Sequence, residues 1–341
     1  MNLPFTNIRQ VLSLHNKVSP EKIFLTVSTD KGREELSYGE FSARCHQTAN
    51  FLQEDLGIKP GNVVNISDDE PATTAVLLMA CWLVGAAIAP VMSGRDIIIN
   101  NVPAKASFVR HRGKQVFNSF APNREWKDKF LVQLGGEPTE GYPHFDTLVR
   151  SMPNSFFNDH EEPTLNTPVF FSYNFKDNVF IPVTQGELLD SAQTLATKQV
   201  ITGNQRVISY LELLGNPDPE SVLNTLSVFI STLLVGASLI LVKLSRPRDV
   251  FYYGPYMEPN AFWREVAASR LHIACITFYQ IKQLIDFAYK QRTDGKPIYG
   301  EGIYQQDIQQ LRHIYCPDAK GQDDLIKQFT DMFPFPIVTS S

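Results

Sequence analysis

The residues best suited to bind a phosphate group lie in the stretch from Pro168 to Leu189. This stretch reads as a buried strand, a polar turn and then a capped helix. Turns in this position bind phosphate through backbone N–H groups, which glycines leave accessible, and through a Lys or a Ser/Thr hydroxyl. Here Ser172 and Lys176 lie in the turn, but the first glycine is Gly186. The position favours a phosphate site, whereas the residue types do not.

Three residues of this stretch are the candidate nucleotide-binding positions: Ser172, Lys176 and Thr184. Thr184 has a structural alternative, because Glu187 follows three residues later and the pair forms the pattern of a capping box at a helix start. Ser172 has one too, since a hydroxyl at the end of a strand can bond to the backbone instead of an anion. Lys176 could supply one positive charge.

The sequence predicts no catalytic residue and no metal site. The seven histidines are scattered, and His160-Glu161-Glu162 is typical of a solvated charge run on a polar loop. The four cysteines are far apart and lack the spacing of a metal site; they are Cys45, Cys81, Cys275 and Cys316. We expect reduced thiols in a cytosol-like compartment. The first ten residues do not have the pattern of a signal peptide, so a cytoplasmic protein is the expectation.

The composition is that of an ordinary globular protein. Its 341 residues are 43% apolar and 20% charged, enough for a large core in two domains or one large α/β unit. The net charge of −5 gives no reason to expect nucleic acid or an anionic membrane as a partner. Two apolar runs, 71–91 and 221–242, each contain a late glycine, which indicates a buried helix followed by a buried strand. We therefore expect no membrane span.

The two apolar runs also resemble each other, because both contain Leu-Val-Gly-Ala between the helix and the strand. The pattern predicts an α/β fold of two pseudo-duplicated, doubly wound layers of mainly parallel sheet with helices on both faces. A polar, proline-containing segment separates the two halves. We expect an N-terminal α/β subdomain at 1–150, a linker at 151–167 and a second α/β subdomain at 168–341.

Aromatic residues gather late in the chain, around 251–256, 262–263 and 278–279. One interpretation is an apolar ligand pocket between the halves, since such pockets favour apolar walls at domain boundaries. The other is ordinary packing in the core and loops.

Several segments resemble the large N-terminal region of the acyl-adenylate-forming family, the AMP-dependent synthetases and ligases. The resemblance covers nearly the whole chain, and it rests on segments that are structural in the family. These segments are LSYGEFSARCHQTANFLQEDLGIKPGNVVNIS (36–67), MACWLVGAAIAPV (79–91), VISYLELLG (207–215), TLLVGASLILV (232–242) and LRHIYCPDA (311–319). It implies the two-layer fold, and it implies that this chain lacks the C-terminal lid domain that carries a catalytic lysine.

The phosphate loop of the family reads Tyr-Thr-Ser-Gly-(Ser/Thr)-Thr-Gly-x-Pro-Lys-Gly and leads to Thr-His-x-Asn. Aligned without a gap, Ser172 matches the first serine and Thr184 the later threonine. The three loop glycines are replaced by Tyr173, Lys176 and Phe180, and the remaining departures are Asn174, Phe175, Asn178, Val179, Gln185 and Glu187. Bulky side chains at glycine positions would keep phosphate oxygens away from the backbone N–H groups.

The resemblance also implies positions for an acyl pocket. The aromatic-His pair of the family falls on Leu214 and Gly215, and the proline of its Val-Pro-Thr block falls on Thr277, beside Phe278. Its Gly-Gly turn falls on Pro317-Asp318. The candidate substrate pocket is therefore Leu214, Gly215 and Phe278. The chain stops before the motif that supplies the magnesium-binding glutamate.

Three hypotheses follow. In the first, the chain is a catalytically degenerate relative that binds a protein partner or a small carboxylate, and no cofactor is expected. In the second, it is a divergent carboxylate–AMP or carboxylate–CoA ligase that uses ATP and Mg²⁺ and is completed by a lid from a partner chain. In the third, these residues are a fragment of a longer chain, and the missing C-terminal motifs carry no meaning.

Overall fold

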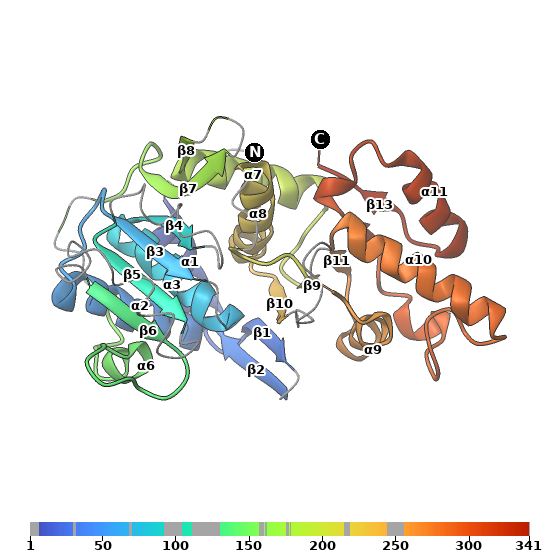
Figure 1. Ribbon diagram of the computed structural model, residues 1–341, viewed down its shortest axis with the longest axis horizontal. Coiled ribbons are helices and arrows are strands. Elements are labelled where there is room, and N and C mark those ends of the chain that lie inside the picture. Colours follow the sequence, from blue (N-terminus) through green and yellow to red (C-terminus); the bar gives the residue numbers. More distant parts are fainter. Residues whose placement is uncertain are drawn as a thin grey trace.

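The computed structural model describes residues 7–29, 32–67, 70–91, 104–110, 130–156, 160, 162–174, 177, 179–214, 219–243 and 256–340. These residues form two sheets with helices packed against them (Figure 1). The predicted α/β class with two mainly parallel sheets is confirmed.

The six-stranded sheet has the order β6-β5-β3-β4-β7-β8, and every neighbouring pair is parallel except β7 with β8. Its strands are β3 (Val63–Ser67), β4 (Ala87–Val91), β5 (Ala106–Arg110), β6 (Phe130–Leu134), β7 (Pro168–Asn174) and β8 (Val179–Thr184). The seven-stranded sheet has the order β13-β12-β11-β9-β10-β1-β2, and only β1 and β2 are antiparallel. Its strands are β1 (Ile23–Thr29), β2 (Gly32–Ser37), β9 (Arg206–Ser209), β10 (Ser238–Val242), β11 (Ile273–Cys275), β12 (His313–Tyr315) and β13 (Ile337–Val338).

Apart from β13, which has no counterpart in the six-stranded sheet, the two sheets share one topology, and each contains a hairpin from the other half of the chain. The β1–β2 hairpin pairs with β10 of the second half, whereas the β7–β8 hairpin pairs with β4 of the first half. After each hairpin comes a helix that starts with a capping box. The pseudo-duplication is thus real, but the halves exchange hairpins. The division at 151–167 stays a prediction.

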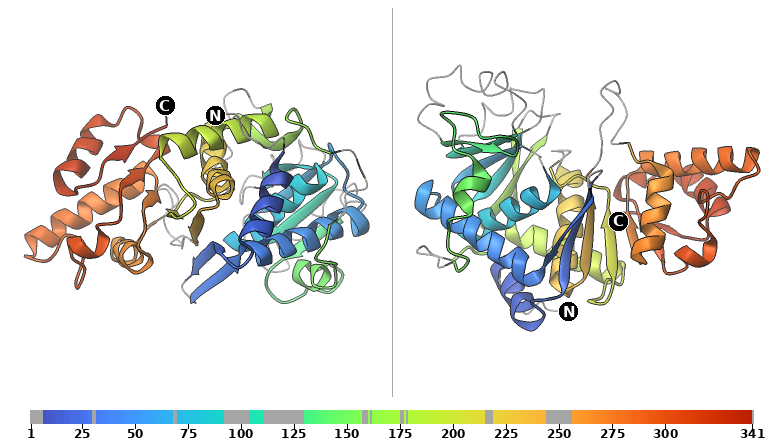
Figure 2. Two further views of the ribbon diagram at one scale, coloured as in Figure 1. Left: turned by 180° about the vertical axis from the view of Figure 1, so that it is seen from behind. Right: turned by 90° about the horizontal axis from the view of Figure 1, so that it is seen from below.

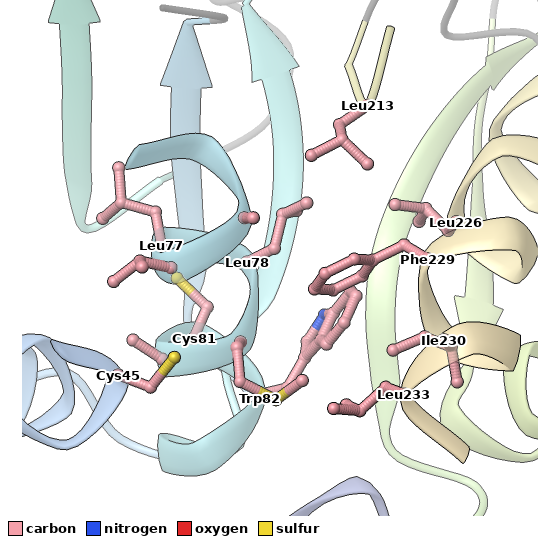
Figure 3. Packing of buried hydrophobic residues seen from close by; sticks show 14 of the residues in the cluster. Cys45, Leu77, Leu78, Cys81, Trp82, Leu213, Leu226, Phe229, Ile230 and Leu233 are labelled. Atoms are coloured by element: carbon pink, nitrogen blue, oxygen red, sulfur yellow. The ribbon is translucent and has the colours of Figure 1, made fainter. Parts of the chain in front are cut away.

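Helices cover the sheets and fill the space between them. They are α1 (Ile8–Val18), α2 (Tyr38–Asn50), α3 (Pro71–Val84), α6 (Phe145–Val149), α7 (Gln185–Lys198), α8 (Pro219–Val235), α9 (Pro259–Ser269), α10 (Phe278–Thr293) and α11 (Asp323–Met332). Figures 1 and 2 show α9, α10 and α11 together at one end of the molecule, beyond β11. Helices α3 and α8 face each other in the core, where the rings of Trp82 and Phe229 have centroids 6.4 Å apart (Figure 3).

Strand residues alternate between two hydrophobic clusters, as a sheet buried on both faces requires. Val207 and Ile273 point into the larger cluster between the sheets, whereas their neighbours Ile208 and Ala274 point into a second cluster under α9, α10 and α11. The seven-stranded sheet is therefore held from both sides, which fixes the positions of its strand ends.

The two apolar runs end as the sequence predicts. Gly85 follows α3 and Gly236 follows α8, with φ of 77° and 74°, a left-handed conformation that glycine adopts without strain. Each glycine leads directly into a buried strand. In the part of the chain described here, no helix is both long and apolar enough to cross a bilayer.

Two strands and one helix end differ from the sequence-based expectation. The segments 32–37 and 179–184 form the edge strands β2 and β8. The sequence predicts only a turn at 30–32 before the capping box that begins at Ser37, and a polar turn between the strand that begins at Pro168 and the helix after Thr184. Both strands are largely exposed, so they lack the apolar alternation of a buried strand. The segment 289–306 contains three glycines and predicts a loop, whereas helix α10 extends to Thr293. Residues 97–99, whose apolar pattern predicts a continuation of the α/β alternation, lie outside the described residues.

Candidate functional site

The turn predicted to bind phosphate is the turn of the β7–β8 hairpin, at the edge of the six-stranded sheet. Ser172 on β7 is fully buried, and its hydroxyl donates a hydrogen bond of 2.9 Å to the backbone oxygen of Ile181 on β8. The bond joins the two strands of the hairpin across a directly opposed pair. The hydroxyl that aligns with the phosphate-loop serine therefore stabilises the hairpin.

Within the turn itself, a carboxylate takes part in the described hydrogen bonds. Asn174 Nδ2 donates to Asp177 Oδ2 at 2.7 Å, and the backbone N–H of Asp177 donates to Asn174 Oδ1 at 3.3 Å. The side chain of Val179, at the position of the loop lysine, is 47% exposed. Lys176 lies outside the described residues. The described part of the turn thus presents a negative and an apolar side chain where a phosphate would need positive charge.

Thr184 forms the predicted capping box at the start of α7. The Glu187 N–H donates to Thr184 Oγ1 at 3.2 Å, and the Thr184 N–H donates to the Glu187 carboxylate at 2.7 Å. Hydrogen bonds from the backbone and hydroxyl of Thr184 hold the pKa of Glu187 below its usual range. The hydroxyl also donates to the same carboxylate at 2.8 Å. The backbone N–H and the hydroxyl of Thr184 therefore both bond to Glu187 at the start of the helix.

Gln185, which sequence reasoning left without a role, lies buried beside the capping box. Its Oε1 accepts from the backbone N–H of Ile8 at 3.3 Å, and its Nε2 donates to the backbone oxygen of Thr164 at 3.1 Å. The side chain therefore connects the start of α1, the segment before β7 and the start of α7. Gln185 aligns with the histidine of the Thr-His-x-Asn motif, and both of its described hydrogen bonds are to backbone groups. Its residue type gave no signal of this role.

The candidate pocket of Leu214, Gly215 and Phe278 stays a prediction. Leu214 is buried in the cluster between the sheets, whereas Phe278 packs against the cluster under α9, α10 and α11. Gly215 lies outside the described residues. Of the late aromatics that the structure describes, Phe262 and Trp263 are buried in the second cluster, whereas Tyr256 and Tyr279 are exposed. The Trp263 ring meets that of Tyr299 edge to face, with centroids 4.9 Å apart. This arrangement favours the packing interpretation for Phe262 and Trp263.

A second candidate location is the carboxyl end of β9 and β11, where the connections of the seven-stranded sheet diverge. The connection after β9 leads to β10 on one side, and the connection after β11 leads to β12 on the other. Ligands in open α/β sheets commonly bind at such a point. Here Asp318 Oδ1 accepts from the backbone N–H of Phe278 at 2.9 Å and lies 3.2 Å from Cys316 Sγ. Asp318 thus caps the start of α10, a role that sequence reasoning missed.

The thiols are structural. All four cysteines are free and buried, as expected from the sequence. Burial raises the pKa of each thiol, and at Cys316 the neighbouring Asp318 raises it further. Within the described ranges, no group of three or more His, Cys, Asp or Glu side chains could hold a metal ion.

Comparisons with known proteins agree with the fold. Residues 12–114 match the family described as AMP-binding enzyme. A Rhodopseudomonas palustris CGA009 protein assigned as a long-chain-fatty-acid CoA ligase superposes with a TM-score of 0.75 at 14% identity, covering 98% of this chain and 75% of that one. The anthranilate CoA ligase AuaEII, solved with anthranoyl-AMP, gives 0.73 at 15% identity, covering 100% of this chain and 61% of the ligase. No curated protein sequence matches significantly.

A third structure defines which part of the ligases this chain resembles. The N-terminal domain of FACL13 from Mycobacterium tuberculosis gives a TM-score of 0.72 at 15% identity, covering 98% of this chain and 76% of that domain. The chain spans only about three fifths of several longer ligases, for example 59% of MatB from Rhodopseudomonas palustris. At these identities the likeness describes the fold alone.

Proposed function

Because this chain has the fold of the N-terminal region of the acyl-adenylate-forming superfamily and matches its AMP-binding family over residues 12–114, we propose that it is a catalytically degenerate relative. It is ligase-like in architecture and acts as a binding or interaction protein. Its ligand is a protein partner or an acyl or aryl carboxylate, the acid class in the names of the fatty-acid and anthranilate ligases. It requires no cofactor, and its location is cytoplasmic.

The observation that carries this proposal is the chemistry of the β7–β8 turn. The Ser172 hydroxyl is committed to Ile181, and the Asp177 carboxylate lies in the turn. A carboxylate about 4 Å from a phosphate charge costs about 1 kcal/mol even in water, and more where water is excluded. A triphosphate would meet this repulsion without glycine N–H groups at 173, 176 and 180 to offset it.

The alternative is a divergent carboxylate–AMP or carboxylate–CoA ligase that uses ATP and Mg²⁺. The AMP-binding family match and the named ligase neighbours favour it. In this case a lid from a partner chain or from further residues would complete the site and exclude water. The two functions make opposite predictions about adenylate formation.

Pyrophosphate exchange with a panel of fatty and aryl acids separates them. The degenerate relative gives no exchange above the protein-free rate, with or without candidate lid-bearing partner chains. A matched variant restores the loop chemistry with Tyr173→Gly, Lys176→Gly, Val179→Lys and Phe180→Gly, and serves to show whether the turn limits nucleotide binding. Pyrophosphate exchange by the wild-type chain that requires one of the fatty or aryl acids, whether the chain is alone or with a partner, would overturn the proposal and establish the ligase.

A further inference from the structure

A row of basic residues lies at the amino edge of the seven-stranded sheet, opposite the strand ends discussed above. Arg206 begins β9, His272 precedes β11 and Arg312 precedes β12. The backbone N–H of His272 donates to Arg206 O at 3.0 Å, and that of Arg312 donates to His272 O at 2.8 Å. The three residues are therefore fixed side by side on neighbouring strands.

Local contacts hold the side chains of Arg206 and His272, and the arginines of the row remain accessible. The backbone N–H of Arg206 donates to His272 Nδ1 at 3.2 Å, and the guanidinium Nη1 of Arg206 donates to the backbone oxygen of Ser269 at 3.0 Å. Arg270, which ends α9 with a φ of 48°, adds a fourth basic group at this edge. Arg206, Arg270 and Arg312 are all exposed. A guanidinium has five N–H donors, so each arginine keeps donors for a ligand.

The positive charge of the row is not compensated in the described part of the chain. There, none of Arg206, Arg270 and Arg312 has a carboxylate within ion-pair distance. The adjacent carboxylate, Glu265, is engaged by Arg33 at 2.9 Å and by the Ser269 hydroxyl. The edge thus carries three unpaired guanidinium groups on a chain whose net charge is −5.

We propose that this basic row, Arg206, Arg270, His272 and Arg312, is a docking surface for an acidic, extended segment of a protein partner. Neighbouring strands lie about 4.8 Å apart, so the row spans about 10 Å of backbone. An extended segment covers that distance with three or four residues and brings two or more carboxylates onto the arginines. This surface does not depend on the proposed function of the β7–β8 turn.

The number and spacing of the arginines in the row favour an acidic protein segment over other anions. An exposed ion pair contributes only about 0.2–1 kcal/mol, so a single small anion would bind weakly, whereas several carboxylates on one segment add their contributions. A nucleic acid or an anionic membrane brings many more negative charges, which the net charge of −5 repels outside the row.

His272 makes the docking sensitive to pH. Partial burial lowers the pKa of His272, and the charges of Arg312 and Arg206 lower it further. Among the described residues, the Arg33–Glu265 pair beside Ser269 and the imidazole of His313 on β12 are further charged or titratable groups around the row. Carboxylates bound to the arginines offset their charge and raise the pKa of His272, so binding takes up a proton. The affinity therefore increases as the pH falls.

Fluorescence anisotropy with a labelled hexaglutamate peptide tests the proposal at about 20 mM salt, where the screening of surface charges is weak. The double variant Arg206→Gln/Arg312→Gln is expected to bind about tenfold more weakly, equivalent to about 1.4 kcal/mol. The matched control Lys290→Gln/Lys327→Gln removes two exposed charges elsewhere and is expected to bind like the wild type. Circular dichroism establishes that each variant is folded, and Arg312→Gln alone replaces the double variant if Arg206→Gln unfolds the chain.

The pH dependence gives a second readout. Wild-type affinity is expected to rise several-fold from about pH 8 to about pH 6, while His272→Gln shows a flat profile. The proposal is overturned if the wild type does not bind hexaglutamate, or if the arginine variant and the lysine control bind equally. It is also overturned if inorganic phosphate displaces the peptide at an equal concentration, since that describes a small-anion site.

Discussion

The Ser172 hydroxyl donates its hydrogen bond to the backbone oxygen of Ile181, 2.9 Å away on the opposite strand of the β7–β8 hairpin. The same hydroxyl aligns with the phosphate-loop serine of the acyl-adenylate-forming family. A buried hydroxyl with a backbone partner stabilises the protein, and giving that partner up for a ligand would lose this stabilisation. This hydrogen bond in the hairpin therefore argues against the phosphate binding that the position of the turn suggests.

The first prediction concerns this bond. Ser172→Ala removes the donor and leaves the Ile181 oxygen without it, so we expect the free energy of unfolding to fall by about 1 kcal/mol in urea denaturation. Ser151→Ala is the matched control, because Ser151 makes a similar bond to Leu148 O on the surface and should cost less than about 0.5 kcal/mol. Equal effects of the two variants would contradict the structural role.

The second prediction concerns the capping box of α7. Because the folded pKa of Glu187 is lowered, its charge stabilises the fold above the unfolded pKa of about 4.3 and loses this effect as the pH falls through the folded pKa. The stability difference between wild type and Glu187→Gln should thus be present near pH 7 and vanish at acid pH. Urea denaturation across this range measures it. A difference that persists unchanged to about pH 2.5 contradicts the assignment.

The third prediction concerns the glycine that ends α8. A Cβ on Gly236 would lie 2.7 Å from Cε1 of His15, whose ring is held by a 3.2 Å contact with Leu234 O. Gly236→Ala should therefore cost at least about 1 kcal/mol more than Gly295→Ala, since overpacking adds to the left-handed strain. Gly295 has a similar φ of 68° and open space around it, which isolates the contact with His15. Thermal unfolding of both variants compares them, and equal melting temperatures would rule out the contact.

The fourth prediction concerns the thiols. All four are buried, and burial raises the pKa of each, so we expect an aromatic disulfide reagent at about pH 7.5 to modify none of them in the native protein within minutes. All four should react after unfolding in guanidinium. A thiol that reacts rapidly in the native state would indicate an accessible site that the structure does not show.

The buried elements could be predicted from the sequence, because their patterns reflect the structure directly. The runs ending at Gly85 and Gly236 combine an apolar helix, a glycine and an apolar strand, and each feature has one physical cause. The capping box at Thr184 is equally local. The edge strands β2 and β8 could not be predicted, because their exposure removes the apolar alternation of a buried strand. In β8, Pro182 also argues against a strand, since proline is rare in strands away from a sheet edge.

The site was predictable in position but not in its contacts. The turn at 174–179 lies where the strand pattern places it, yet the Ser172–Ile181 bond depends on β8, which the sequence does not reveal. The exchange of hairpins between the two halves also has no local signal, since strand pairing is decided by tertiary packing.

Calorimetric titration of the native chain with ATP–Mg²⁺ tests the central claim most directly. It measures nucleotide binding, which the β7–β8 turn would mediate, without requiring a carboxylate substrate or a lid. If the turn is a structural remnant, we expect no saturable heat and a Kd weaker than about 1 mM, equivalent to less than about 4 kcal/mol of binding free energy. Saturable binding of one nucleotide with a Kd in the micromolar range, abolished by Ser172→Ala at unchanged stability, would contradict the account.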